Sequence, residues 1–355
     1  MKSVLVLEDG TYFSGEAFGH NGETIGEVVF NTCMTGYQEI ATDPSYNGQI
    51  VTMTYPLIGN YGFNQFDNES FRPHLQGFIV KELCDYPNNW RNTIDPNEYF
   101  KKHHIVGIKG IDTRALTQHI RQFGSMMGII STECGNVDIL LNKLNLNKSE
   151  KRNLVMEVTT KTVIHKPGNG KKVVLLDFGV KFNIIRSLEA RNCDIYILPA
   201  FSSYEEIMSY NPDGILLSNG PGDPADLTSI HSTVQKLLGK KPILGICLGH
   251  QLLGLALGGK TYKLKFGHHG GNHPVKDYNT GRCYITSQNH NYALEKDFSE
   301  DIEITHLNVN DHTVEGFRHK HIPIISVQYH PEAAPGPQDS AYIFDDFVKM
   351  MVGGS

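Results

Sequence analysis

The sequence predicts an α/β protein in which a smaller, strand-rich α+β domain (1–150) precedes a mostly parallel sheet flanked by helices (172–355). Two observations predict this class. From Val173 onward, short apolar runs alternate with amphipathic stretches, as in a parallel sheet covered on both faces. Before residue 150, the apolar runs are β-like and separated by turn clusters. The polar stretch 151–171 is predicted to be the linker between them.

Composition excludes several classes of protein. The 355 residues suffice for two domains, and 32 basic against 38 acidic residues argue against binding to nucleic acid or a membrane surface. The six cysteines are scattered without a CxxC pair, so we expect neither a zinc or other metal site nor a disulfide framework. The N-terminus has too few apolar residues for a signal peptide, which predicts a cytoplasmic location.

The N-terminal domain should begin with strands and contain at least one capped helix. Strands are expected at 4–7, 27–32 and 49–55, each bounded by turn residues. A helix is expected over 112–121, with Asp112 as its N-cap. No catalytic or metal-binding pattern is recognisable in this half of the sequence.

The C-terminal domain should alternate strand and helix. Strands are expected at 173–177, 194–198, 214–218, 243–246 and 324–329. The helices between the first four are expected near 184–190, 204–210 and 227–238. Because sites in such sheets lie at the carboxyl ends of the strands, the residues that follow each strand are the candidates for chemistry.

The strand 243–246 runs directly into Cys247, which stands between Gly245 and Gly249 and precedes a helical stretch. Strand, tight turn and helix around a nucleophile form a nucleophile elbow, here with cysteine in place of serine. Glycine on both sides removes the Cβ atoms that would collide. The helix N-terminus favours a thiolate, and the Leu248 N–H would point toward an oxyanion. The alternative is a buried structural cysteine.

Two further loops belong at this edge of the sheet. The loop 218–224 is stiffened by prolines, and the Gly222 N–H is a candidate second oxyanion donor, although an ordinary turn would have the same composition. After the last strand, His330 and Glu332 are two residues apart and would point the same way on a strand. A carboxylate beside an imidazole makes a general base for Cys247, with a surface turn as the alternative.

Three other motifs are weaker. The stretch 254–261 matches a phosphate-loop pattern, but a helix runs into it and none should begin at its lysine, so we do not expect nucleotide binding. His268 and His269 lie in 266–274, which we expect to be a structured polar loop rather than a metal site. The amides of 287–292, after a strand at 283–286, could bind a polar substrate or satisfy loop backbone.

Taken together, the motifs 245–251, 220–222 and 330–332 resemble class I (triad) glutamine amidotransferase domains. Further segments resemble the small, glutaminase subunits of carbamoyl-phosphate synthetases, and with them the resemblance covers nearly the whole chain. These segments are 7–11, 28–40, 42–46, 110–114, 218–224, 266–274 and 287–290.

The resemblance implies that glutamine is hydrolysed through a thioester on Cys247, with His330 as base and then acid and Glu332 orienting it. Ammonia would pass through a tunnel to a separate large subunit that uses ATP and bicarbonate to make carbamoyl phosphate for arginine or pyrimidine biosynthesis. No cofactor is implied on this chain. The implied glutamine contacts are Ser45, Gly220, Gly222, Leu248, Gln251, Asn289, Asn291 and Tyr292. Because Ser45 belongs to the N-terminal domain, the site should lie between the domains.

Some positions depart from the family pattern. Asn291 and Tyr292 stand where glycine and phenylalanine are usual, and His269 and Gly271 replace a usual arginine and alanine. Three rival functions are a glutaminase of another complex, such as anthranilate or GMP synthesis, a non-catalytic regulatory subunit, and a free-standing cysteine hydrolase. The N-terminal domain argues against the first, and the complete set of triad residues argues against the second.

Overall fold

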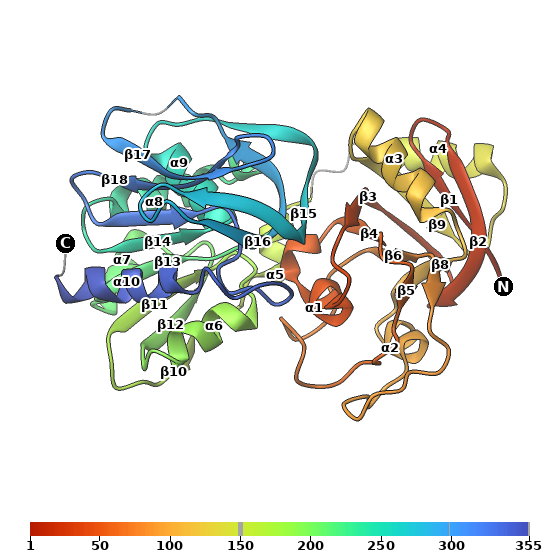
Figure 1. Ribbon diagram of the computed structural model, residues 1–355, viewed down its shortest axis with the longest axis horizontal. Coiled ribbons are helices and arrows are strands. Elements are labelled where there is room, and N and C mark those ends of the chain that lie inside the picture. The colour runs from red at the N-terminus through yellow and green to blue at the C-terminus, as the bar shows by residue number, and fades with distance from the viewer. Residues whose placement is uncertain (148–151, 298, 354–355) are drawn as a thin grey trace. The chain divides into compact units, whose positions relative to one another are not determined.

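The computed structural model describes residues 1–147, 152–297 and 299–353. The chain forms two compact units (Figure 1). The first unit comprises Met1–Arg152 together with Lys265–His269, and the second comprises Asn153–Leu264 together with Gly270–Ser355. No helix in the described part of the chain is long and apolar enough to cross a membrane.

The first unit is built around a closed barrel with the strand order β1-β2-β8-β6-β4-β3-β9. These strands are β1 (Lys2–Leu7), β2 (Tyr12–Gly19), β3 (Glu23–Asn31), β4 (Gln49–Met53), β6 (Gly77–Val80), β8 (Val106–Lys109) and β9 (Met126–Ser131). The predicted strands are found as β1, β3 and β4. Closure of the barrel was not predicted, because it depends on pairing between strands far apart in sequence, such as β1 with β9.

Helices α1 (Tyr37–Thr42), α2 (Pro96–Lys102), α3 (Thr113–Phe123) and α4 (Val137–Asn147) accompany the barrel. Asp112 caps α3 as predicted, since its side chain accepts a hydrogen bond from the Ala115 N–H at 2.9 Å. Helix α4 was not predicted, because its three asparagines have low helical propensity. Leu140 and Leu144 bury completely against β1 and β9, so tertiary packing outweighs a weak helical propensity.

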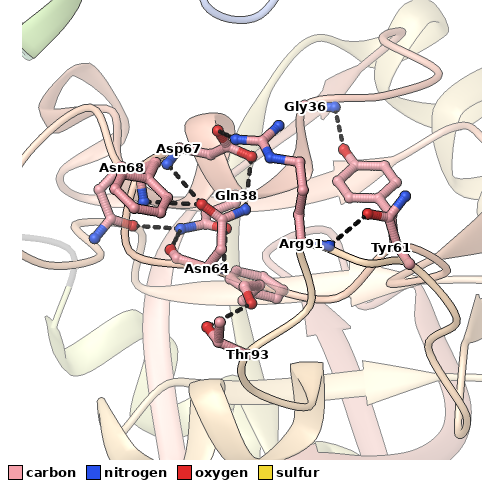
Figure 2. Close-up of polar contacts among 11 residues, drawn as sticks. Gly36, Gln38, Tyr61, Asn64, Asp67, Asn68, Arg91 and Thr93 are labelled. Atoms are coloured by element: carbon pink, nitrogen blue, oxygen red, sulfur yellow. Dashed lines mark hydrogen bonds and ion pairs between the residues drawn. The ribbon is translucent and has the colours of Figure 1, made fainter.

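Outside the barrel strands β4 and β6, the chain between α1 and α2 has little regular structure beyond the short 3-10 helix Pro44–Tyr46, β5 (Leu57–Ile58) and β7 (Glu82–Leu83). Side-chain hydrogen bonds fix this stretch (Figure 2). The buried Gln38 accepts from the Asn64 N–H at 2.9 Å and donates to the Asn64 carbonyl. Asp67 accepts from the Asn64 side chain and pairs with Arg91. An irregular segment is therefore anchored to α1 by polar groups that would otherwise be buried without partners.

The second unit contains a ten-stranded sheet with the order β10-β12-β11-β13-β14-β19-β18-β17-β15-β16. Its parallel part consists of β12 (Asp194–Pro199), β11 (Lys172–Asp177), β13 (Gly214–Leu217), β14 (Ile243–Ile246) and β19 (Ile324–Val327). This confirms the predicted parallel sheet. It is extended by β10 (Ile164–Lys166), β15 (Thr261–Asp277), β16 (Cys283–Leu294), β17 (Ile302–Asn308) and β18 (Val314–His319), several of them paired antiparallel.

Helices cover both faces of this sheet, as Figure 1 shows. One face packs against α7 (Tyr204–Ser209), α8 (Thr228–Leu237) and α9 (Leu248–Ala256) through a shared apolar cluster. The other packs against α6 (Phe182–Glu189) and α10 (Tyr342–Val352). Because both faces are covered, the central strands consist of continuous apolar residues. This is why their positions could be predicted from the sequence.

Two stretches expected as loops are strands in the structure. Residues 266–274 and 287–292, expected as loops, lie within the long strands β15 and β16. Their histidines, glycines and asparagines have low strand propensity, and strand pairing outweighs it. The stretch 151–171, expected as a linker, carries α5 (Leu154–Val158) and β10 among its described residues, and Val155 is buried in the core of the second unit.

Candidate active site

Cys247 occupies the turn between β14 and α9, where the sequence placed it. Its φ of 53° lies in the left-handed region that non-glycine residues rarely adopt, and only 2% of the residue is exposed. A Cβ at Gly249 would lie 2.1 Å from the Leu217 carbonyl oxygen, and one at Gly245 would lie 2.7 Å from the Gly249 oxygen. Both neighbours must therefore be glycine for the elbow to fit, and the thiol donates to the Asn289 carbonyl oxygen at 3.6 Å.

His330 and Glu332 come together as predicted, but not on a strand. β19 ends at Val327, and His330 makes only an isolated bridge with Ser287, to whose carbonyl its N–H donates at 2.9 Å. A turn follows, in which the Ala333 N–H donates to the His330 carbonyl at 3.1 Å. This turn, rather than strand alternation, brings His330 Nδ1 to 2.6 Å from Glu332 Oε1.

Lys181 is the functional candidate that the sequence analysis missed. Its ammonium lies 3.1 Å from Glu332 Oε1 and also donates to the Ala333 carbonyl, and the two paired side chains are 2% and 0% exposed. The residue stands just before α6, with its N–H donating to Asn219 Oδ1 at 3.1 Å. The available signal was its position shortly after β11, at the edge of the sheet where sites form.

The charged groups of Lys181, Glu332 and His330 interact with one another in the protein interior. Burial opposes charge on His330, but the neighbouring Glu332 and Cys247 outweigh it and raise the pKa of His330 well above its usual value. Burial likewise opposes charge on Glu332, but Lys181 and His330 hold the pKa of its carboxyl far below its usual value. The imidazole therefore has a carboxylate on its Nδ1 side and interacts with the cysteine, as a proton-transferring base requires.

This arrangement predicts an acid-dependent contribution to stability. Because the pKa of Glu332 is lowered in the folded state, its contribution is present above its ordinary pKa of 4.5 and is lost as pH falls toward about 2. In Glu332→Gln, the deficit in unfolding free energy relative to wild type should shrink over that window. Denaturant unfolding at a series of pH values measures it, and a deficit independent of pH would contradict the assignment.

The loop after β13 is packed tightly beside the elbow. A Cβ at Gly220 would lie 2.3 Å from the Phe178 carbonyl oxygen, and Gly222 has a φ of 95°. Ser218 Oγ accepts from the Phe178 N–H at 2.9 Å, while the Ser218 carbonyl accepts from the Gly249 N–H at 3.0 Å. The loop is thus held against the start of α9. The role of the Gly222 N–H as an oxyanion donor stays a prediction.

The other residues predicted to contact glutamine lie in both units. Gln251 on α9 donates to the Tyr292 carbonyl at 2.7 Å and to Gln328 Oε1 at 3.0 Å, which ties α9 to β16. Ser45 lies in the first unit, in the short 3-10 helix Pro44–Tyr46, where its N–H donates to Asp43 Oδ1 at 2.9 Å. The predicted contacts that lie in the second unit are Gly220, Gly222, Leu248, Gln251, Asn289, Asn291 and Tyr292.

The phosphate-loop pattern has the wrong context, as expected. Gly254 lies inside α9, where a Cβ would collide with Leu294, and Gly258 ends the helix with a φ of 86°. Lys260 then leads into β15 rather than into a helix.

Comparison with known proteins agrees with the geometry. The model of class-I glutamine amidotransferases matches residues 174–350, and that of the carbamoyl-phosphate synthase small chain, CPSase domain, matches residues 5–130. The carbamoyl phosphate synthase small chain of Bacillus caldolyticus is 53% identical over 355 residues, covering 99% of this chain and 97% of that protein.

Two further proteins are similar to this chain, one over nearly its whole length and the other over about half of it. The carbamoyl phosphate synthase pyrimidine-specific small chain of Bacillus subtilis is 51% identical over 351 residues, covering 99% of this chain and 96% of that protein. Among solved structures, a glutamine amidotransferase from Thermotoga maritima gives a TM-score of 0.42 at 16% identity, covering 52% of this chain and 99% of that chain.

Proposed function

Because the chain belongs to the carbamoyl phosphate synthase small chain family and has a class-I glutamine amidotransferase domain, we propose that Cys247, His330 and Glu332 hydrolyse glutamine. The ammonia released is passed to a large synthetase subunit, the partner in a heterodimer, which makes carbamoyl phosphate from bicarbonate and ATP. ATP is bound by that partner, and this chain requires no cofactor or metal. The observation that carries the proposal is the buried His330–Glu332 pair, held by Lys181, beside a cysteine in an elbow.

The reaction proceeds in two steps. His330, whose pKa is raised, holds the proton of the Cys247 thiol as the sulfur attacks the side-chain amide carbon of glutamine, and it then gives that proton to the leaving nitrogen, so that ammonia departs and a thioester remains. Water then attacks the thioester while His330 takes its proton, and the thiolate leaves with glutamate as the product. Glu332 keeps the imidazole oriented and stabilises its cationic form.

Glutamine binding is assigned by position in the family pattern. The proposed contacts are Ser45, Gly220, Gly222, Leu248, Gln251, Asn289, Asn291 and Tyr292. The N–H groups of Leu248 and Gly222 would stabilise the oxyanion, each worth about 2.7–4 kcal/mol by analogy with other hydrolases. All six cysteines are free thiols, which fits a reducing cytoplasm, and we place the protein there.

The test measures ammonia release from glutamine by the purified chain, alone and with a carbamoyl-phosphate synthetase large subunit, ATP and bicarbonate. The expected result is hydrolysis that the partner stimulates, with carbamoyl phosphate formed. Hydrolysis indifferent to that subunit would overturn the partner and keep the chemistry. No hydrolysis under either condition would overturn the enzymatic assignment in favour of a regulatory subunit.

A further inference from the structure

A path of buried polar side chains begins at Glu315 on β18. Glu315 is fully buried, and its Oε2 accepts a hydrogen bond from Gln288 Nε2 at 2.9 Å. The same amide nitrogen donates to Thr286 Oγ1 at 3.2 Å. An ionised carboxylate can only accept hydrogen bonds, so it holds the NH₂ group of Gln288 toward itself and turns the amide oxygen the other way.

The path continues to the residues beside Cys247. Gln288 Oε1 lies 2.8 Å from His290 Nε2, and His290 Nδ1 lies 2.7 Å from the Tyr292 carbonyl oxygen. That same carbonyl accepts from Gln251 Nε2 at 2.7 Å. The polar path therefore connects Glu315 with α9 one turn beyond the nucleophile.

The starting point of the path is itself fixed. The other carboxylate oxygen of Glu315 accepts from Asn308 Nδ2 at 3.2 Å and from Thr313 Oγ1 at 3.3 Å. The Glu315 carbonyl accepts from the Gln328 N–H at 2.9 Å, and Gln328 Oε1 accepts from Gln251 Nε2 at 3.0 Å. Both hydrogen bonds made by Gln251 Nε2 therefore lead back to Glu315, one to its side chain through His290 and Gln288, and the other to its backbone carbonyl through Gln328.

We infer that Gln288 and Glu315 are positioning residues for glutamine: acting through His290, their side chains set the orientation of the Tyr292 carbonyl and thereby of the Gln251 side chain that donates to it. The inference rests on the proposed function, in which Gln251 and Tyr292 contact glutamine. Neither Gln288 nor Glu315 is assigned a contact with the substrate or the reacting atoms. If these two residues only satisfied buried polar groups, their loss would lower stability and leave glutamine affinity unchanged.

The test compares glutamine affinity with stability. L-glutamine is titrated calorimetrically into Cys247→Ser protein, which cannot form the thioester, with and without Gln288→Leu. We expect the dissociation constant to rise roughly tenfold, the effect of losing about one hydrogen bond's worth of binding energy. In the Cys247 enzyme, Gln288→Leu should raise KM by a similar factor and change kcat little.

Two further variants make the comparison specific. Val314→Ala alters the residue next to Glu315 on β18, and because Val314 packs in the apolar core it should lower the melting temperature without changing glutamine affinity. Glu315→Gln keeps the shape of the side chain and removes its charge, so it supplies the same measurement if Gln288→Leu does not fold. We expect Glu315→Gln to weaken binding less than Gln288→Leu does.

The outcomes separate the inference from the function on which it rests. Wild-type affinity in both Gln288→Leu and Glu315→Gln, with lowered melting temperature, would overturn the inference alone. A Cys247→Ser parent that binds no glutamine would overturn the proposed contacts and the inference together. Combining Gln288→Leu with Gln251→Leu should give less than the sum of the two effects, because both act on one contact, and strictly additive effects would also count against the inference.

Discussion

Replacing Cys247 with serine should abolish glutamine-dependent activity while leaving the fold, partner binding and ammonia-dependent synthesis intact. Serine matches cysteine closely in size, so the elbow and its two glycines are undisturbed. A hydroxyl ionises far less readily than a thiol, and we expect ammonia release from glutamine to fall by roughly 10³-fold or more, as in other triad hydrolases that lose their nucleophile. Steady-state assays with glutamine and with ammonium salts measure the two activities separately.

The matched control for this variant is Cys283→Ser. Cys283 is exposed at the start of β16, so its replacement should change neither rate. If Cys247→Ser kept most of the glutaminase rate, or if Cys283→Ser lost it, the nucleophile would be wrongly assigned. Loss of ammonia-dependent synthesis in Cys247→Ser would mean instead that the substitution disturbs the complex and not only the thiol chemistry.

The parts of the fold and site that depend on residues close together in the sequence could be predicted, and those that depend on distant residues could not. The elbow was predictable because Gly245, Cys247 and Gly249 form one contiguous pattern with a steric reason for each residue. The parallel strands were predictable because they are buried on both faces. The barrel of the first unit was not, because its closure depends on strands such as β1 and β9 meeting across more than a hundred residues.

The pairing of His330 with Glu332 was anticipated for an incorrect local reason. A strand would have put both side chains on one face, whereas the structure achieves the contact through a turn after Val327. Lys181 was missed because nothing near it in the sequence shows that it meets Glu332, about 150 residues away. A buried lysine is exceptional in a folded protein, and only the tertiary structure reveals which charge it neutralises.

Lys181→Met should therefore have a large effect, although Lys181 itself is expected to touch no substrate. Removing the ammonium leaves the carboxylate of Glu332 buried with less positive charge around it, and breaking such a pair costs about 3–5 kcal/mol of unfolding free energy. Lys181 also lowers the pKa of His330, so its loss should raise that pKa further. The limb of the pH–rate profile that titrates His330 should then move to higher pH.

Lys166→Met is the matched control, because Lys166 pairs with Glu189 at 4.0 Å on the surface, with both side chains nearly half exposed. Exposed pairs contribute at most about 1 kcal/mol, so this variant should unfold and titrate like wild type. Denaturant unfolding measures the stability of both variants, and their pH–rate profiles measure the titration of His330. Wild-type stability with an unshifted profile in Lys181→Met would show that Glu332 is held by His330 alone, whereas lost stability with an unshifted profile would confine Lys181 to a structural role.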